Sequence, residues 1–181
     1  MVLRYTKHIM MRLSQTLLNQ PVLSLRTGGH IATTISPIIN PNNLKIEGFF
    51  CQDSIDKKKQ LVLLDQDIRD LLPQGIVVND HEVLSEISEL PRLKEIINLN
   101  FTLIGKQVIT ASKKTLGKVN DYSVDGSSMF IHKLNVSLPI MRNFIGEGLV
   151  VDRTQIIEIT SKQVIIGDLE QTVPARAAAT A

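Results

Sequence analysis

The fold is decided by residues 102–108, TLIGKQV, because they repeat in chemical type and order residues 16–22, TLLNQPV. Both segments run from a threonine through two apolar positions to a closing valine, and they lie 86 residues apart (102 − 16). An internal repeat means that each copy has to be interpreted as one structural unit. A chain of 181 residues is long enough for two small domains at this spacing.

Three further pairs of segments follow in the same order, at offsets of 85 to 88 residues. Each match is weak alone, because few residues are identical. Together, the four collinear matches predict a tandem repeat that needs only small insertions. The additional pairs are 40–46 with 125–131, 67–71 with 155–159, and 75–80 with 163–168.

Each copy has the pattern of a β-meander. Short apolar segments alternate with turns rich in Gly, Asn, Asp and Ser, such as 125–128. Leu44 and Ile46 alternate with Lys45 and Glu47, which is typical of a strand with one solvated face. Aromatic residues make up only 4% and Trp is absent, so Ile, Leu and Val must form the core. The sequence therefore predicts a mainly β fold.

The segment between the copies has a helical pattern. Apolar residues recur at helical spacing over 81–98, Asn79 or Asp80 can cap such a helix, and Pro91 either interrupts it or begins a second one. A short helix is also expected over 10–18. The predicted organisation is a first β domain at 11–80, a helical linker at 81–98, a second β domain at 99–170 and a disordered tail at 171–181.

The second copy resembles a PRC-barrel domain. Its residues 103–106, 116–121 and 151–159 are similar, in this order, to the opening, the second strand and a late segment of that family. The first copy is less similar, because Asn19 and Ala32 stand where the second copy has glycine. The resemblance implies two small PRC-type β-barrels in tandem, joined by the helical linker. Gly117 lies within a strand, where glycine usually marks a bulge or a close backbone approach.

PRC-barrel domains include the cytoplasmic domain of the photosynthetic reaction centre H subunit and the C-terminal domain of a ribosome maturation factor. Both uses are protein contact and assembly. The resemblance therefore implies a non-catalytic binding or adaptor protein with a protein partner, and an assembly factor in ribosome or RNA metabolism is the favoured hypothesis. A structural partner that docks on the soluble side of a membrane or photosynthetic complex is the alternative. An enzyme of unknown class is the third hypothesis.

Charge and composition restrict the partners. The net charge is +2, whereas a dedicated nucleic-acid binder needs a strongly basic surface, so only weak RNA contact is expected. No run approaches the roughly 20 apolar residues of a membrane span, and the first residues lack the apolar core of a secretory signal. A single cysteine, Cys51, excludes an internal disulfide and is expected to be buried. We therefore expect a cytoplasmic protein without membrane insertion.

Two pairs of neighbouring residues are the candidate partner contacts. Phe49 and Phe50 must face opposite sides of a strand, so one ring is expected to pack against the other copy or, less favoured, to form an exposed binding patch. Lys113 and Lys114 belong, with Lys106 and Lys118, to a lysine group in the second copy that can contact RNA, although a solvated loop is the simpler interpretation.

No residue pattern indicates catalysis or a cofactor. Asp65, Asp67, Asp70 and Glu158 can be proposed as an acidic group, but capping and solvated surface explain them more simply, with Asp65 and Asp152 as the expected N-caps of single helical turns. The histidines have no metal-ligand spacing. We predict no catalytic residue, no cofactor, no metal site and no small-molecule substrate.

Overall fold

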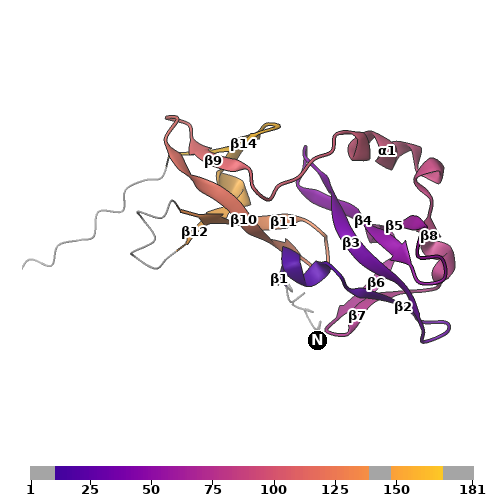
Figure 1. Cartoon of the computed structure of the whole chain (residues 1–181). Coiled ribbons are helices and arrows are strands. Elements are labelled where there is room, and N and C mark those ends of the chain that lie inside the picture. Colours follow the sequence, from indigo (N-terminus) through magenta and orange to yellow (C-terminus); the bar gives the residue numbers. More distant parts are fainter. Residues whose placement is uncertain (1–10, 139–147, 169–181) are drawn as a thin grey trace, which may run out of the picture.

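The computed structural model describes residues 11–138 and 148–168, and two β-sheets dominate this part of the chain (Figure 1). The mainly β fold predicted from the sequence is confirmed. In the first half of the chain, seven strands pair in the order β6-β7-β2-β3-β4-β5-β8. These strands are β2 (Pro21–Ser24), β3 (His30–Asn40), β4 (Lys45–Asp53), β5 (Gln60–Leu64), β6 (Ile68–Leu72), β7 (Gly75–Val78) and β8 (Leu84–Ser85).

The second sheet also has seven strands. Six of them pair in the order β12-β11-β10-β9-β14-β13, and β1 pairs with β10 beside this path. The strands are β1 (Met11–Leu13), β9 (Gln107–Thr110), β10 (Thr115–Asp125), β11 (Ile131–Ser137), β12 (Leu149–Asp152), β13 (Ile156–Ile159) and β14 (Gln163–Ile166). The first strand of the chain therefore belongs to the sheet that the second half forms.

The two sheets share one pattern of strand pairing. β2 pairs in parallel with β7, as β9 does with β14, and the other pairs are antiparallel. Ile39 opposes Ile46 in the first sheet, and Val124 opposes Ile131 at the equivalent place in the second, 85 residues later (124 − 39). A bulge directly precedes this pair in both ladders. The segments that match in sequence thus occupy equivalent strands.

Neither sheet closes into the barrel that the family resemblance implies. Within the described residues, each sheet has two free ends, at β6 and β8 in the first and at β12 and β13 in the second. A 3-10 turn, η2 (Asp65–Asp67) or η6 (Arg153–Gln155), follows β5 or β12 and redirects the chain. The next strand, β6 or β13, then pairs with β7 or β14 and not with the strand it has just left.

The predicted linker helix over 81–98 is wrong in its first part. This part contains the 3-10 turn η3 (His81–Val83), the strand β8, and the 3-10 turn η4 (Ile87–Glu89). Asp80 does cap, but only η3, by accepting a hydrogen bond from the backbone N–H of His81. The chain then extends, because Leu84 inserts into the core and pairs with Leu63 at the edge of β5. The helix α1 (Pro91–Asn98) begins at Pro91, in agreement with one of the two roles predicted for this proline.

The helix expected over 10–18 is also replaced, by β1 and the 3-10 turn η1 (Ser14–Leu17). β1 runs antiparallel to the end of β10, with Met11 opposite Asp125. Arg12 also donates a hydrogen bond to the carbonyl oxygen of Leu71 in β6, so this strand connects both sheets. Pairing with a distant strand outweighs local helix propensity here.

The two halves meet through equivalent turns, at a contact that we call the junction. The backbone N–H of Ile46 donates to the carbonyl oxygen of Met129, and that of Ile131 donates to Leu44, both at 2.9 Å. Leu44 and Met129 are themselves equivalent, and both have left-handed backbone conformations, with φ of 54° and 58°. The contact is therefore reciprocal, as in a two-fold symmetric dimer. One continuous hydrophobic core extends through both halves.

Three local predictions can be compared with the structure. Cys51 is fully buried, as expected, and burial raises the pKa of its thiol to about 12. Asp152 is an N-cap, accepting from the backbone N–H of Thr154, whereas Asp65 lies inside its turn and the residue at the N-cap is Leu64. Gly117 lies at a bulge.

Among the described residues, no helix is long and apolar enough to cross a membrane. The predicted tail at 171–181 lies outside the described residues.

Candidate partner-binding cleft

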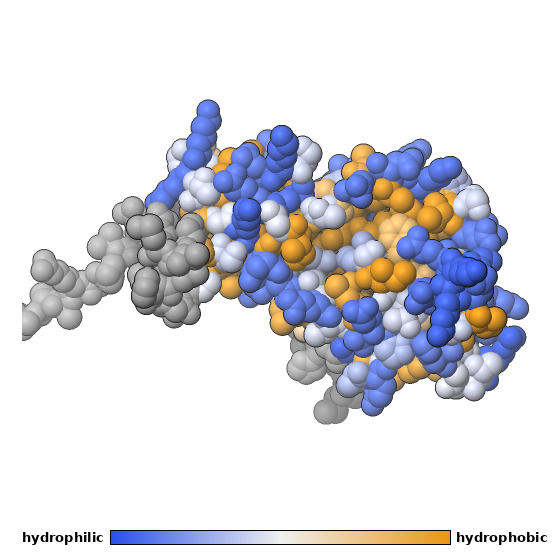
Figure 2. Space-filling model, in the orientation of Figure 1, coloured by the Kyte–Doolittle hydropathy of each residue, from blue (hydrophilic) through white to orange (hydrophobic). Residues whose placement is uncertain are grey.

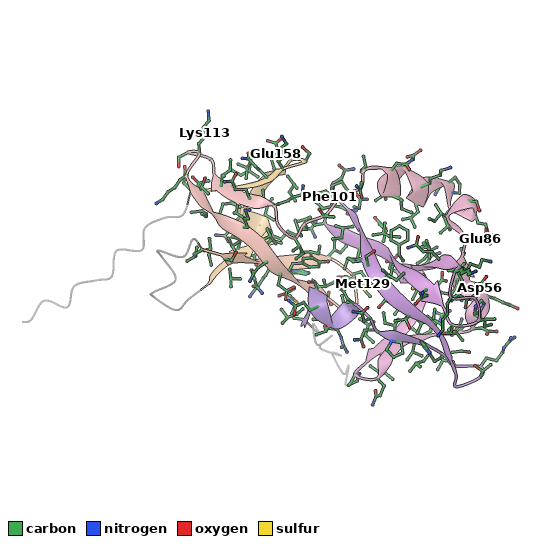
Figure 3. The ribbon with its side chains drawn as sticks, viewed as in Figure 1. Asp56, Glu86, Phe101, Lys113, Met129 and Glu158 are labelled. Carbon is green, nitrogen blue, oxygen red and sulfur yellow. The ribbon has the colours of Figure 1, made fainter. Side chains whose placement is uncertain are left out.

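A cleft of about 250 Å³ opens at the junction, on the side of α1. We call it the junction cleft. Its walls are the last part of β3, the C-terminal turn of α1, the connecting segment 100–104 and the start of η1, with Tyr122 of β10 behind them. Figure 3 shows Phe101, one of the lining residues, between the two halves.

The cleft lies between equivalent parts of the two halves. Ser14 and Asn100 both line it, and they are 86 residues apart (100 − 14). The same holds for Leu18 and Ile104, which are also 86 residues apart. In each half, these residues belong to the segment that leads into the first strand of the repeat. The junction cleft is therefore a product of the contact between the halves, and neither half forms it alone.

A buried polar cluster closes one end of the cleft. Oδ1 of Asp121 accepts hydrogen bonds from the backbone N–H of Ser14 at 3.2 Å and from that of Tyr122 at 2.7 Å. It also accepts one from the hydroxyl of Ser14. Asp121 is only 7% exposed, so these donors compensate the desolvation of its carboxylate. Burial, together with the charge of Asp121, raises the pKa of Tyr122 well above its usual range.

The lining is apolar with a few neutral polar groups. Among the described residues, no charged side chain lines the cleft, and its polar groups are hydroxyls and one amide, from residues such as Ser36, Thr102 and Asn100. The raised pKa of Tyr122 keeps its phenol protonated. An apolar cleft with a few placed polar groups is the usual form of a binding site.

Exposed apolar side chains follow the lining residues along the chain. Ile104, which lines the cleft, is 46% exposed, and Leu99, next to Asn100, is 58% exposed. Ile35, next to Ser36, is also exposed. Figure 2 shows apolar surface at the junction and across the front of the first half. Clustered apolar surface of this kind is typical of a site for another macromolecule.

Phe49 and Phe50 have the opposite orientations that the sequence requires. Phe49 is fully buried in the main core. Phe50 is partly buried in a smaller cluster with Ile38, Val62 and Leu93 beneath α1, and it also lines the junction cleft. Its ring therefore packs mainly against the linker helix, a neighbour that the sequence analysis did not consider. Of the two, only Phe50 is available for contact with a partner.

Lys113 and Lys114 lie in the turn between β9 and β10, at the end of the second half away from the junction (Figure 3). Both are exposed. Lys106, from the same group, is instead buried, and its Nζ donates to the carbonyl oxygens of Thr160 and Ser161 at 3.0 and 2.5 Å. The lysine group is therefore smaller at the surface than it is in the sequence.

Of the acidic group considered for catalysis, Asp65 and Asp70 line one hollow together with Arg69, and Glu158 is not part of it. Asp65 forms an ion pair with Lys45 at 2.6 Å, and Asp70 accepts from the backbone N–H of Leu71. Glu158 lies in β13 of the other sheet. Among the described residues, no group of three or more His, Cys, Asp or Glu side chains is arranged to hold a metal ion.

Comparison with known proteins adds no identification. The chain matches no protein-family model, and a search of curated proteins gave no significant match.

The cleft itself was not predicted from the sequence, because Ser14 and Asp121 are 107 residues apart and nothing local connects them. The available signal was the repeat, in which Leu18 and Ile104 occupy matching positions ahead of the first strand.

Proposed function

We propose that this chain is a non-catalytic binding protein, an adaptor or assembly factor that holds a protein partner in the junction cleft. The observation that carries the proposal is the lining of the cleft, which is apolar, contains no charged side chain from the described part of the chain and includes the exposed Ile104. Binding at such a site is favourable because it removes apolar surface from water. It offers no pair of titratable groups for proton transfer.

The size of the cleft supports a protein as the ligand. A volume of about 250 Å³ lies just below the range of roughly 300 to 1,000 Å³ that is common for sites of small molecules and cofactors. It is large enough for an apolar anchor side chain. Protein interfaces commonly concentrate their binding energy in such central pockets, surrounded by contacts that exclude water. Ile104, which lines the cleft and is exposed, is placed to form part of that surrounding ring.

The proposal includes two PRC-type halves that work in the cytoplasm, in ribosome or RNA metabolism. The resemblance of the second copy to the PRC-barrel family supports it, as does the shared strand order of the two sheets. Membership of that family would connect the chain to domains that act by protein contact and assembly. RNA contact is weak in this proposal, because only a few exposed lysines, such as Lys113 and Lys114, are grouped at one surface.

The test is an affinity pull-down from native lysate, with and without nuclease, that compares the unchanged chain with Ile104→Glu. A carboxylate at the rim must be desolvated when a partner docks, so we expect retention of the partner to fall by about tenfold or more. Retention by the unchanged chain should survive nuclease and physiological salt, because apolar contacts are screened little. Ile157→Glu, at an exposed position of β13, is the matched control.

Two results would contradict the proposal. One is retention that Ile104→Glu and Ile157→Glu reduce equally, which would indicate non-specific adhesion. The other is loss of all retained material after nuclease, together with tight RNA binding at physiological salt that Lys113→Glu/Lys114→Glu abolishes. That result would establish an RNA-binding protein, because a few lysines acting on phosphates alone give steeply salt-dependent affinity.

A further inference from the structure

A second hollow lies beside the N-terminal part of α1, and we call it the α1 groove. It has a volume of about 480 Å³ and is bounded by β4, the end of β5, η2 and the corner where η4 leads into α1. Its apolar side chains include Leu64, Leu90, Leu93 and Ile96. Ile96 also lines the junction cleft, which lies at the C-terminal end of α1, so the two hollows adjoin along the helix.

The apolar floor of the α1 groove is only half covered by the chain itself. It belongs to a small hydrophobic cluster, separate from the main core, in which Leu93 is buried but Leu64, Leu90 and Ile96 remain partly accessible. The cause is the length of α1, which has eight residues and a single buried side chain, Leu93. Figure 2 shows this apolar surface beside the polar face of the helix.

Carboxylates surround the apolar floor. Glu47, Asp65 and Glu89 line the α1 groove, against one cationic lining residue, Arg92. Glu47 and Asp65 share one lysine, Lys45, whose Nζ lies 3.6 and 2.6 Å from their carboxylate oxygens. Glu89 forms no salt bridge within the described residues. The surface therefore offers more negative charge than its own cations neutralise.

The equivalent corner of the second half lacks this combination. Glu47 and Asp65 correspond to His132 and Arg153, and the guanidinium of Arg153 lies over the ring of Phe130, 4.8 Å from its centre. The net charge of each half differs in the same sense. Residues 11–98 contain 9 Lys and Arg against 11 Asp and Glu, whereas residues 99–168 contain 8 Lys and Arg against 6 Asp and Glu. The acidic, apolar groove is thus a property of the first half alone.

We propose that the α1 groove is a docking site for a basic amphipathic segment of a protein partner. Its apolar side chains would complete the half-covered cluster beside α1, and its Lys or Arg side chains would pair with Glu89 and with the Glu47 and Asp65 carboxylates. Helical segments bind apolar grooves through residues spaced i, i+3, i+4 and i+7, and opposite charges at the rim fix their orientation. This surface is distinct from the junction cleft, whose lining is neutral.

The test uses a synthetic amphipathic helix with leucine on one face and lysine on the other, labelled for fluorescence anisotropy. Its counterpart carries glutamate in place of every lysine. We expect the lysine peptide to bind the full chain and the glutamate peptide to bind at least about tenfold more weakly, since like charges then face each other. Raising the salt concentration should weaken the lysine peptide's binding, because rim charges are solvent-exposed.

Variants locate the binding. Glu47→Gln and Glu89→Gln preserve the shape of the side chain and one acceptor oxygen but remove the charge, and each should weaken binding of the lysine peptide by about two- to fivefold. Glu158→Gln, in the second sheet, and Ile104→Glu, in the junction cleft, should leave it unchanged. A thermal melt of each variant separates loss of binding from loss of folding.

Equal affinity for the two peptides, or equal binding by the Glu47→Gln/Glu89→Gln variant and the unchanged chain, would overturn this inference. Neither result would affect the junction cleft, because that proposal is tested by Ile104→Glu. Conversely, peptide binding that Ile104→Glu abolishes and the Glu47→Gln/Glu89→Gln variant does not would move the basic partner from the α1 groove to the junction cleft.

Discussion

The first and second halves of the molecule have the same strand pairing but differ in what covers their outer surfaces. Val62 in β5 is fully buried within the cluster under α1, and β8 pairs along the edge of its strand, whereas the equivalent Val150 in β12 is 53% exposed. Phe50, which pairs with Val62, corresponds to Asn135, which pairs with Val150. The shared pairing sets the scaffold, and the linker between the halves makes the first one different. Both proposed docking surfaces are next to this linker.

The largest expected effect concerns the one bulge at which the halves carry different small residues. Gly117 opposes Val108 where Ala32 opposes Val22. A Cβ at Gly117 would lie 2.0 Å from the carbonyl oxygen of Ser137, which is far inside contact distance. Gly117 does not have a positive φ, so the close approach of the backbone, and not its torsion, excludes a side chain.

We expect Gly117→Val to destabilise the protein by about 3 kcal/mol or more, because β10 and β11 must separate to admit the side chain. Urea denaturation gives the free energy of unfolding. Ala32→Gly is the control, and should cost only about 1 kcal/mol, since it removes a methyl group and frees the backbone. Equal losses of stability for the two variants would show that the neighbouring strand is no closer to the backbone at Gly117 than at Ala32.

The second comparison is between Val62 and Val150. Val62→Ala removes buried methyl groups from a packed site and should lower the free energy of unfolding by about 2 kcal/mol. Val150→Ala removes groups that are already half in water, and should change it by less than about 0.5 kcal/mol. A loss at Val150 as large as at Val62 would mean that β12 is covered in solution, and would contradict the difference between the two surfaces.

The third comparison is between the turns that meet at the junction. Asn40 and Asp125 begin equivalent turns, and their Oδ1 atoms accept from the backbone N–H groups of Asn42 and Ser127 at 3.1 and 3.0 Å. Burial disfavours the charged form of Asp125, but hydrogen bonds from Ser127 and Ser128 outweigh it and hold the pKa of the carboxyl below its usual value. Of these two side chains, only that of Asp125 can therefore change its charge as the pH falls.

A carboxyl whose pKa is lowered by folding stabilises the protein above its unfolded pKa of about 3.9, and this contribution is lost as the pH falls through the folded value. We expect the stability of the unchanged chain to fall below about pH 4, and Asp125→Asn to make this fall shallower. Thermal melts across the acid range measure it, with Glu95→Gln on α1 as the control. Identical acid profiles for the two variants would exclude Asp125 as a contributor.

The sequence predicts the features of this fold that depend on neighbouring residues better than those that depend on contacts between distant segments. The alternation of Ile46 with Lys45 and Glu47, and the repeat itself, identified the strands, because period-two patterns reflect local geometry. Leu44, which was expected in the same strand, instead lies in the turn before β4. The pattern over 81–98 predicted helix on both sides of Pro91, yet Leu84 pairs with Leu63 in an edge strand. Tertiary pairing overrode a weak local propensity there.

The candidate cleft shows the same difference between local features, which the sequence predicted, and contacts between distant segments, which it did not. Phe50 was identified as one of two rings that must face opposite ways, but its neighbour α1 was not foreseen. The contact between Ser14 and Asp121 joins β10 to a segment that the sequence analysis expected to be helical. Surfaces that arise between two halves depend on how the halves meet, and the reciprocal hydrogen bonds of Leu44 and Met129 that fix this contact have no local signature.

The smallest expected effect lies at the first turn of each copy. Gly28 and Lys113 occupy equivalent positions, and both have left-handed backbones, with φ of 69° and 65°. This conformation is free of steric cost for glycine but strained for lysine. Lys113→Gly should therefore raise the free energy of unfolding by about 0.5–1 kcal/mol, because relief of strain exceeds the added entropy of the unfolded chain. Urea denaturation measures the gain. Lys114→Gly, at the neighbouring position without positive φ, should give no gain, and a gain of the same size there would show that the removed charge, not the backbone, is responsible.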